Sequence, residues 1–184
     1  VKLFTNCRFG MIYWQLGILC YAYKQYKDLG FVSTSMIVNI VLQTVYIAKF
    51  FWWERGYMSS MDIQHDRAGF YLCWGCMAFL PMIYTSHSFY LTKHPIALSL
   101  PFACFITFVG LFGIWMNYDA DHQRQHFREM GGHVTIWGKP AEYIEATYKT
   151  TDGKTRQSLL LTSGWWGVAR HFHYVGELTA AFSW

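Results

Sequence analysis

The stretch FVSTSMIVNIVLQTVYIAKFFWW, residues 31–53, decides the fold class. A helix that crosses a bilayer needs about 20 predominantly apolar residues. This stretch is long enough, and its single charged residue, Lys49, lies near its end. The sequence therefore predicts a transmembrane helix here.

Four further segments are largely apolar, namely residues 9–23, 68–91, 96–118 and 163–184, of which the last is the most polar. Charged residues make up only 14% of the chain, against about 25% in soluble domains. We predict an all-α fold, a polytopic transmembrane bundle with four spans and part of a fifth. It would form a single membrane domain over residues 1–184.

The formal net charge is +4, a small excess for a chain with such long apolar runs. This charge is too small for a basic nucleic-acid-binding surface, so we predict membrane lipids and no nucleic acid as partners. The composition also excludes a disordered tail and a disulfide-stapled miniprotein. Because the chain begins at Val1 and ends in an apolar run at Trp184, we expect a fragment of a longer protein.

Residues 119–158 form the longest polar segment and are rich in Lys and Arg. Cytoplasmic loops carry the excess of these residues, so we predict a cytoplasmic loop. Residues 142–161 alternate in polarity around Asp152-Gly153, a turn signal that is typical of a β-hairpin. A plain loop with one turn fits this pattern equally well.

Arg124 and Arg128 follow the charge-free segment and share one helix face, since they are four residues apart. Each guanidinium can bind two phosphate oxygens, which indicates a phosphate site; a solvated helix end is the alternative. His122 and His126 have metal-ligand spacing. Membrane di-iron oxygenases need further boxes with adjacent histidines, which this sequence lacks, so we predict no metal.

Residues 164–174, GWWGVARHFHY, place one arginine, two histidines and large aromatics within an apolar segment. Ionisable groups in such segments usually face a cavity or a partner. One interpretation is a pocket wall, with Arg170 on a phosphate and Trp165 and Trp166 stacked on a planar ring. The other is an interfacial belt at the lipid headgroups.

Tyr46 lies one turn after Gln43 and one turn before Lys49 in the first stretch. A phenol placed between an amide and an ammonium could donate a proton, and a hydrogen-bonded core tyrosine is the other interpretation. Cys73-Trp74-Gly75-Cys76 is a C-x-x-C inside an apolar run. We therefore predict buried, inert cysteines there instead of a redox or metal site.

Residues 159–171, LLLTSGWWGVARH, resemble the L-L-x-S-G-W-W-G-x-x-R-H signature of the sterol reductase family, which includes Δ14- and Δ7-sterol reductases and the lamin B receptor. The resemblance extends over the whole chain, from CRFG at residues 7–10 to QR at 123–124 and FR at 127–128. Residues 136–140 and 169–172 resemble the Δ7-reductase branch, and Lys49, residues 74–76 and His173 resemble its plant form.

The resemblance implies a parent protein with roughly ten helices in the endoplasmic reticulum membrane. It also implies NADPH-dependent reduction of a sterol ring double bond, at Δ7 or alternatively at Δ14, with the sterol taken from the bilayer. Tyr46 falls near a tyrosine proposed as the proton donor. The residues expected to bind the cofactor are Arg124, Arg128, Leu161, Trp166, Arg170, His173 and Tyr174.

The chain departs from the family pattern at three positions: His173 replaces a frequent Asn, Lys49 a frequent Asp, and Glu177 a common Asp. The family's C-terminal block is absent, so we expect this fragment alone to be inactive. A membrane di-iron oxygenase and a non-catalytic sterol-binding scaffold are the alternatives from other classes. The sequence predicts no particular protein partner.

Overall fold

The computed structural model describes residues 2–57, 69–150 and 153–184. The chain divides into two compact units. The helical unit comprises residues 1–112 and 179–184, and the hairpin unit comprises residues 113–178. The single domain expected over residues 1–184 stays a prediction.

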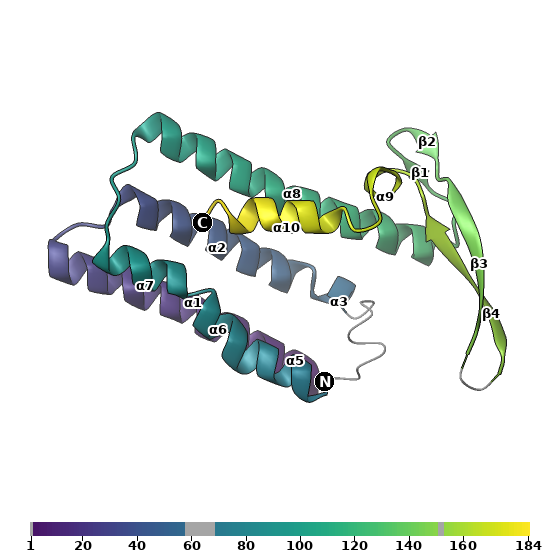
Figure 1. Ribbon diagram of the computed structural model, residues 1–184, viewed down its shortest axis with the longest axis horizontal. Helices are drawn as coiled ribbons and strands as arrows, with labels where there is room; N and C mark the ends of the chain where they lie inside the picture. The colour runs from purple at the N-terminus through teal and green to yellow at the C-terminus, as the bar shows by residue number, and fades with distance from the viewer. Residues whose placement is uncertain (1, 58–68, 151–152) are drawn as a thin grey trace. The chain divides into compact units, whose positions relative to one another are not determined.

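The helical unit begins with α1 (Lys2–Leu29) and α2 (Thr34–Trp52), which the short α3 (Glu54–Tyr57) follows. Ser33 is the N-cap of α2, because its hydroxyl accepts a hydrogen bond from the backbone N–H of Met36. A run of shorter helices lies beside α1 (Figure 1). They are α5 (Phe70–Trp74), the π-helix η1 (Gly75–Phe79), α6 (Leu80–Ile83) and α7 (Ser86–Lys93).

This run replaces the continuous span expected over residues 68–91. Pro81 has no backbone N–H, and its ring crowds the preceding turn of a helix. The wider π-turn η1 occupies the residues just before it, so that the chain continues without a full break. Thr85 then donates its hydroxyl to the carbonyl of Pro81 at 2.6 Å, where the run bends again before α7.

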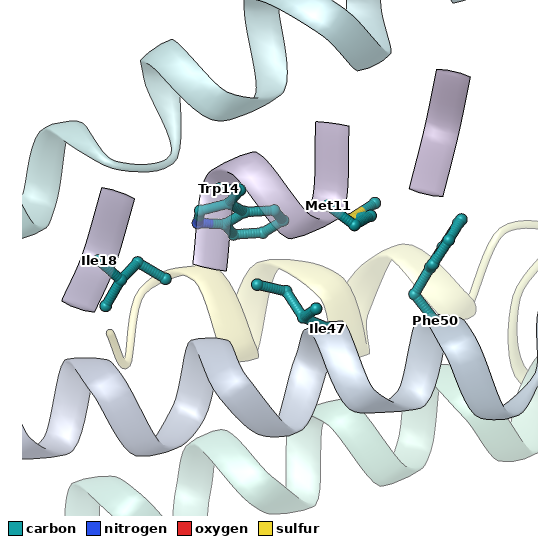
Figure 2. Close-up of a cluster of buried hydrophobic side chains, with 5 residues drawn as sticks. All are labelled: Met11, Trp14, Ile18, Ile47 and Phe50. Carbon is teal, nitrogen blue, oxygen red and sulfur yellow. The ribbon is translucent and has the colours of Figure 1, made fainter. Parts of the chain in front are cut away.

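The largest buried cluster of the helical unit joins α1 to α2. Met11, Trp14 and Ile18 of α1 pack against Ile47 and Phe50 of α2, as Figure 2 shows. Trp14 and Ile18 are fully buried. Burying a large apolar side chain contributes about 1.5–3 kcal/mol, so this cluster holds the two helices together.

A chain of buried polar side chains runs beside this cluster. The indole N–H of Trp14 donates to Gln43 Oε1 at 2.6 Å, and Gln43 Nε2 donates to Asn39 Oδ1 at 2.6 Å. Asn39 Nδ2 in turn donates to Ser88 Oγ at 2.7 Å. The chain links α1, α2 and α7 and satisfies groups that would be costly to bury unpaired.

The hairpin unit contains the end of α8 (Leu100–Glu129) and two strand pairs. β3 (Tyr143–Lys149) and β4 (Thr155–Leu161) are antiparallel, and Tyr143 pairs with Leu161 at the base. Of the two interpretations of residues 142–161, the structure has the hairpin.

The second strand pair was not predicted. β1 (Thr135–Ile136) and β2 (Lys139–Pro140) are joined by Trp137 and Gly138, with φ values of 50° and 78°. Two consecutive residues with positive φ form the tight turn that suits the twist of a hairpin. The sequence carried this signal only in Gly138, because tryptophan seldom adopts such a backbone.

The expected helix over residues 163–184 is divided into α9 (Trp165–Val168) and α10 (His173–Ala181). Ala169 adopts an extended backbone, which ends α9 after a single turn. Within the described residues, α2 and α8 are the two helices long and apolar enough to cross a membrane. The number of spans stays a prediction.

Candidate functional site

One wall of the hairpin unit is built where α9 lies against α8. The indole N–H of Trp166 donates to the backbone carbonyl of Ala120 at 2.7 Å. The guanidinium of Arg124, one turn further along α8, lies over the Trp166 ring with its Cζ 4.7 Å from the ring centroid. A cation in this position is attracted to the ring face, so each side chain fixes the other.

The neighbouring Trp165 is held by a different set of contacts. Its indole N–H donates to Asp119 Oδ2 at 2.7 Å, and its backbone N–H donates to Gln123 Oε1 at 3.2 Å. Gln123 Nε2 also donates to Asp119 Oδ2 at 2.7 Å. Its ring stacks on Phe172 with centroids 4.7 Å apart. Trp165 therefore has partners within the protein for its indole N–H, its backbone N–H and its ring, and the stacking of both tryptophans on a ligand ring stays a prediction.

His173 and Tyr174 continue the wall at the start of α10. Asn117 of α8 donates its amide N–H to the His173 carbonyl at 3.1 Å. The His173 ring lies 4.2 Å from Tyr174 and 5.3 Å from Trp166 between centroids. The structure thus brings together four of the predicted cofactor residues: Arg124, Trp166, His173 and Tyr174.

The close approach of α10 to α8 depends on Gly176. A Cβ at this position would overlap the backbone of α8 at Gly113 and Asn117. The glycine is buried, and it lets the two backbones come within contact distance. The positions of His173 and Tyr174 over α8 follow from this contact.

Arg124 has a second partner besides Trp166, and the remaining predicted cofactor residues lie on α8 and on the neighbouring elements. Arg124 forms an ion pair with Asp121 at 2.9 Å, and about 29% of its side chain is exposed. Arg128 lies on the same face of α8 one turn further on and is exposed. Arg170 is exposed between α9 and α10, and Leu161 is the last residue of β4.

Tyr46 belongs to the helical unit, where it lies on α2 beside the main core cluster. Its ring is 5.8 Å from Trp14 and 5.4 Å from Trp184 between centroids. The ammonium of Lys49 lies 4.9 Å from the centroid of the Tyr46 ring. The predicted proximity of Tyr46 and Lys49 is therefore present.

A cavity of about 630 Å³ opens in the helical unit. It is lined mainly by apolar side chains, including Val38, Leu91, Ile106 and Trp184. Ligand pockets commonly have about 300–1,000 Å³ and mostly apolar walls. Trp184 lines this cavity and also contacts the ring of Tyr46.

Among the described residues, no three His, Cys, Asp or Glu side chains are placed to hold a metal ion. The rings of His122 and His126 stack with centroids 6.1 Å apart and planes 6° apart. The absence of a metal stays a prediction.

Sequence reasoning missed Asn117, Asp119 and Gln123 as positioning residues. Asp119 and Gln123 are four residues apart, which places them on one face of α8 and was a usable signal. Asn117 is an amide in a stretch without charges, and such a group needs a partner when it is buried.

The family model described as the ergosterol biosynthesis ERG4/ERG24 family matches residues 1–184. The chain belongs to this family. It is 54% identical over 184 residues to the 7-dehydrocholesterol reductase of Arabidopsis thaliana, covering 100% of this chain and 43% of that protein. It is 44% identical over 182 residues to the protein of the same name from Danio rerio, covering 99% and 38%.

The Delta(14)-sterol reductase of Methylotuvimicrobium alcaliphilum is also similar, at 40% identity over 184 residues, which cover 100% of this chain and 41% of that protein. The chain thus spans less than half the length of these relatives. The ERG4/ERG24 match confirms the sterol reductase family that the signature at residues 159–171 indicates.

Proposed function

We propose that the protein carrying this chain reduces a ring double bond of a sterol at Δ7, with NADPH as the reductant. The observation that carries the proposal is the contact of Arg124 with Trp166, a residue of the family signature, next to His173 and Tyr174. Relatives named 7-dehydrocholesterol reductase reach 54% identity, which favours Δ7. Reduction at Δ14 is the second candidate, favoured by the 40% identical relative.

The residues of the hairpin unit fit a phosphate-bearing cofactor. Arg124 and Arg128 lie on one face of α8, and each planar guanidinium can bind two phosphate oxygens. Asp121 and the Trp166 ring orient Arg124 in advance, which lowers the entropy lost on binding. NADPH supplies a hydride when it is bound, and the aromatic wall would exclude water from that transfer.

The helical unit would supply the proton. Reduction of an isolated alkene needs an acid, and Tyr46 Oη would donate its proton to one alkene carbon. The Lys49 ammonium beside the ring would stabilise the phenolate that remains. The apolar cavity that shares Trp184 with Tyr46 would accept part of the flat sterol.

The same proposal places the protein in the endoplasmic reticulum membrane as a multi-pass protein, with residues 119–158 on the cytoplasmic side. The apolar helices α2 and α8 support a membrane location. The sterol would enter from the lipid bilayer. The cofactor would bind from the cytoplasm, where Arg128 is exposed beyond the apolar part of α8.

The test is to express the full-length protein that carries this chain in cells that accumulate Δ7- and Δ14-unsaturated sterols. We expect mass spectrometry of the sterols to show loss of the Δ7 double bond, in an amount equal to the amount of NADPH oxidised. Loss of the Δ14 double bond alone would favour the second candidate. Sterol binding without NADPH oxidation would favour a scaffold, and iron with oxygen consumption would favour an oxygenase.

The role of Tyr46 has its own test in the same full-length protein. Tyr46→Phe removes only the hydroxyl and should lower kcat by about 10²–10⁴, the usual contribution of a general acid, with sterol and NADPH binding unchanged. Tyr84→Phe is the matched control, because Tyr84 also packs on Trp14, with centroids 4.8 Å apart. If Tyr46→Phe and Tyr84→Phe both kept the kcat of the unmutated protein, Tyr46 would be excluded as the acid.

A further inference from the structure

Three of the five cysteines gather at one end of the helical unit. The Sγ atoms of Cys7 in α1 and Cys76 in η1 are 3.1 Å apart. Cys73 lies one turn before Cys76 and accepts a weak hydrogen bond from Asn6 Nδ2 at 3.5 Å. No disulfide joins any of the five cysteines, all of which the structure describes.

The backbone itself keeps Cys7 and Cys76 together. Gly10 lies three residues after Cys7 and therefore on the same face of α1. A Cβ at Gly10 would overlap the carbonyl oxygen of Cys76, so the two helices touch there through their backbones. The pairing of the two thiols is thus built into the crossing of α1 and η1.

The other cysteines are placed differently in the helical unit and in α8. Cys73 and Cys76 are three residues apart on one helical run, which holds their side chains on successive turns. A bridge needs Cβ atoms about 3.5–4.5 Å apart, and helical neighbours seldom reach this without unwinding. Cys20 and Cys104 are exposed, and the structure gives neither a thiol partner.

In contrast to the inert role that the sequence predicts for Cys76, we propose that Cys7 and Cys76 form a dithiol site that glutathione disulfide, or a related small disulfide, oxidises to a Cys7–Cys76 disulfide. One of the two thiolates attacks the small disulfide, forms a mixed disulfide with one of its sulfurs and releases one glutathione thiol. The thiolate of the other cysteine then attacks the Sγ atom that carries glutathione and displaces the second glutathione thiol. Two protein thiols lose two electrons and two protons, and one small disulfide becomes two thiols.

This oxidation would bind the first turns of α1 to η1 covalently. The π-helix η1 is an irregular turn, and such turns are frequent at functional sites. A cross-link across it fixes the crossing of α1 and η1 in one arrangement. The site is independent of the proposed sterol chemistry, because it uses none of the residues assigned to that reaction.

The test uses membranes containing the full-length protein that carries this chain. They are treated with glutathione disulfide or left reduced, and remaining thiols are alkylated before digestion without reductant. We expect mass spectrometry to find the peptide of Cys7 linked to that of Cys76, and reductant to separate them. Cys20→Ser should leave this linkage unchanged, and Cys7→Ser should abolish it.

Two results obtained with the unmutated protein would overturn the proposal. One is a wild-type linkage map that joins Cys73 to either of the other two cysteines. The other is full alkylation of Cys7 and Cys76 under conditions in which exposed Cys20 becomes glutathionylated. Both results are independent of sterol reduction, so a failure here leaves the proposed function untouched.

Discussion

Replacing Arg124 by alanine should weaken NADPH binding strongly, because this side chain is oriented before the cofactor arrives. Its guanidinium is held by Asp121 at 2.9 Å and by the Trp166 ring at 4.7 Å, and about 29% of the side chain is exposed. A hydrogen bond to a charged group contributes about 1.5–3 kcal/mol. At about 1.4 kcal/mol per factor of ten, the dissociation constant should rise about 10- to 150-fold.

The assay is cofactor titration of the full-length protein that carries this chain, for NADPH and for NADH. Arg124→Lys keeps the charge but loses the two-pronged geometry, so we expect an intermediate loss. Arg156→Ala is the matched control, since it removes the same charge from an exposed position on β4. NADPH should be preferred over NADH by the unmutated protein, and Arg124→Ala should narrow this preference.

The reasoning would be refuted if Arg124→Ala and Arg156→Ala weakened NADPH binding to the same extent. That result would mean that only overall charge attracts the cofactor. Equal use of NADH by the unmutated protein would contradict a site at Arg124 for the 2′-phosphate, the group by which NADPH differs from NADH.

Two further predictions concern the stability of the helical unit, measured by thermal unfolding of the full-length protein in detergent. Gly10→Ala should lower the free energy of unfolding by about 1–3 kcal/mol, because the new methyl group overlaps the backbone of η1. Gly75→Ala is its control: the new methyl group meets open space, so the change should be neutral or slightly stabilising. Gln43→Leu should cost about 1–3 kcal/mol for each buried polar partner that is left unsatisfied. Gln15→Leu loses an exposed hydrogen bond of 3.0 Å and should cost less. The reverse order would contradict a stabilising role for the buried chain of hydrogen bonds.

Periodicity and composition predicted α2 outright and gave the hairpin as one of two equal interpretations, because both elements depend on neighbours in sequence. The apolar stretch at residues 31–53 forms α2, and the hairpin interpretation of residues 142–161 followed from alternation and one turn signal. Gly153 has a φ of 74° at that turn, the backbone that makes a glycine signal dependable.

Contacts between elements could not be predicted in the same way. Asn39 and Ser88 are 49 residues apart, and nothing in either local pattern indicates that they share a hydrogen bond. The division of residues 163–184 was missed for a related reason. Hydropathy describes an average over a window, whereas α9 ends because Ala169 adopts an extended backbone.

The two tryptophans of the signature show what the structure adds to a motif. In sequence Trp165 and Trp166 are equivalent, but successive residues of a helix point about 100° apart. The Trp165 indole therefore donates to Asp119, and that of Trp166 to the carbonyl of Ala120, the next residue of α8. Only Trp166 also lies beside the guanidinium of Arg124.

The glycines that flank this pair are explained by the same contacts. Gly164 has a φ of 63°, and a Cβ there would overlap Gln123 Oε1, the acceptor for the backbone of Trp165. A Cβ at Gly167 would crowd the carbonyl of Thr162. The two glycines of the G-W-W-G motif thus allow the single turn of α9 to pack closely against α8. Trp166 is bonded to Ala120 of α8 and lies against Arg124 of the same helix, so the positions of the two side chains are fixed together, as a preorganised binding wall requires.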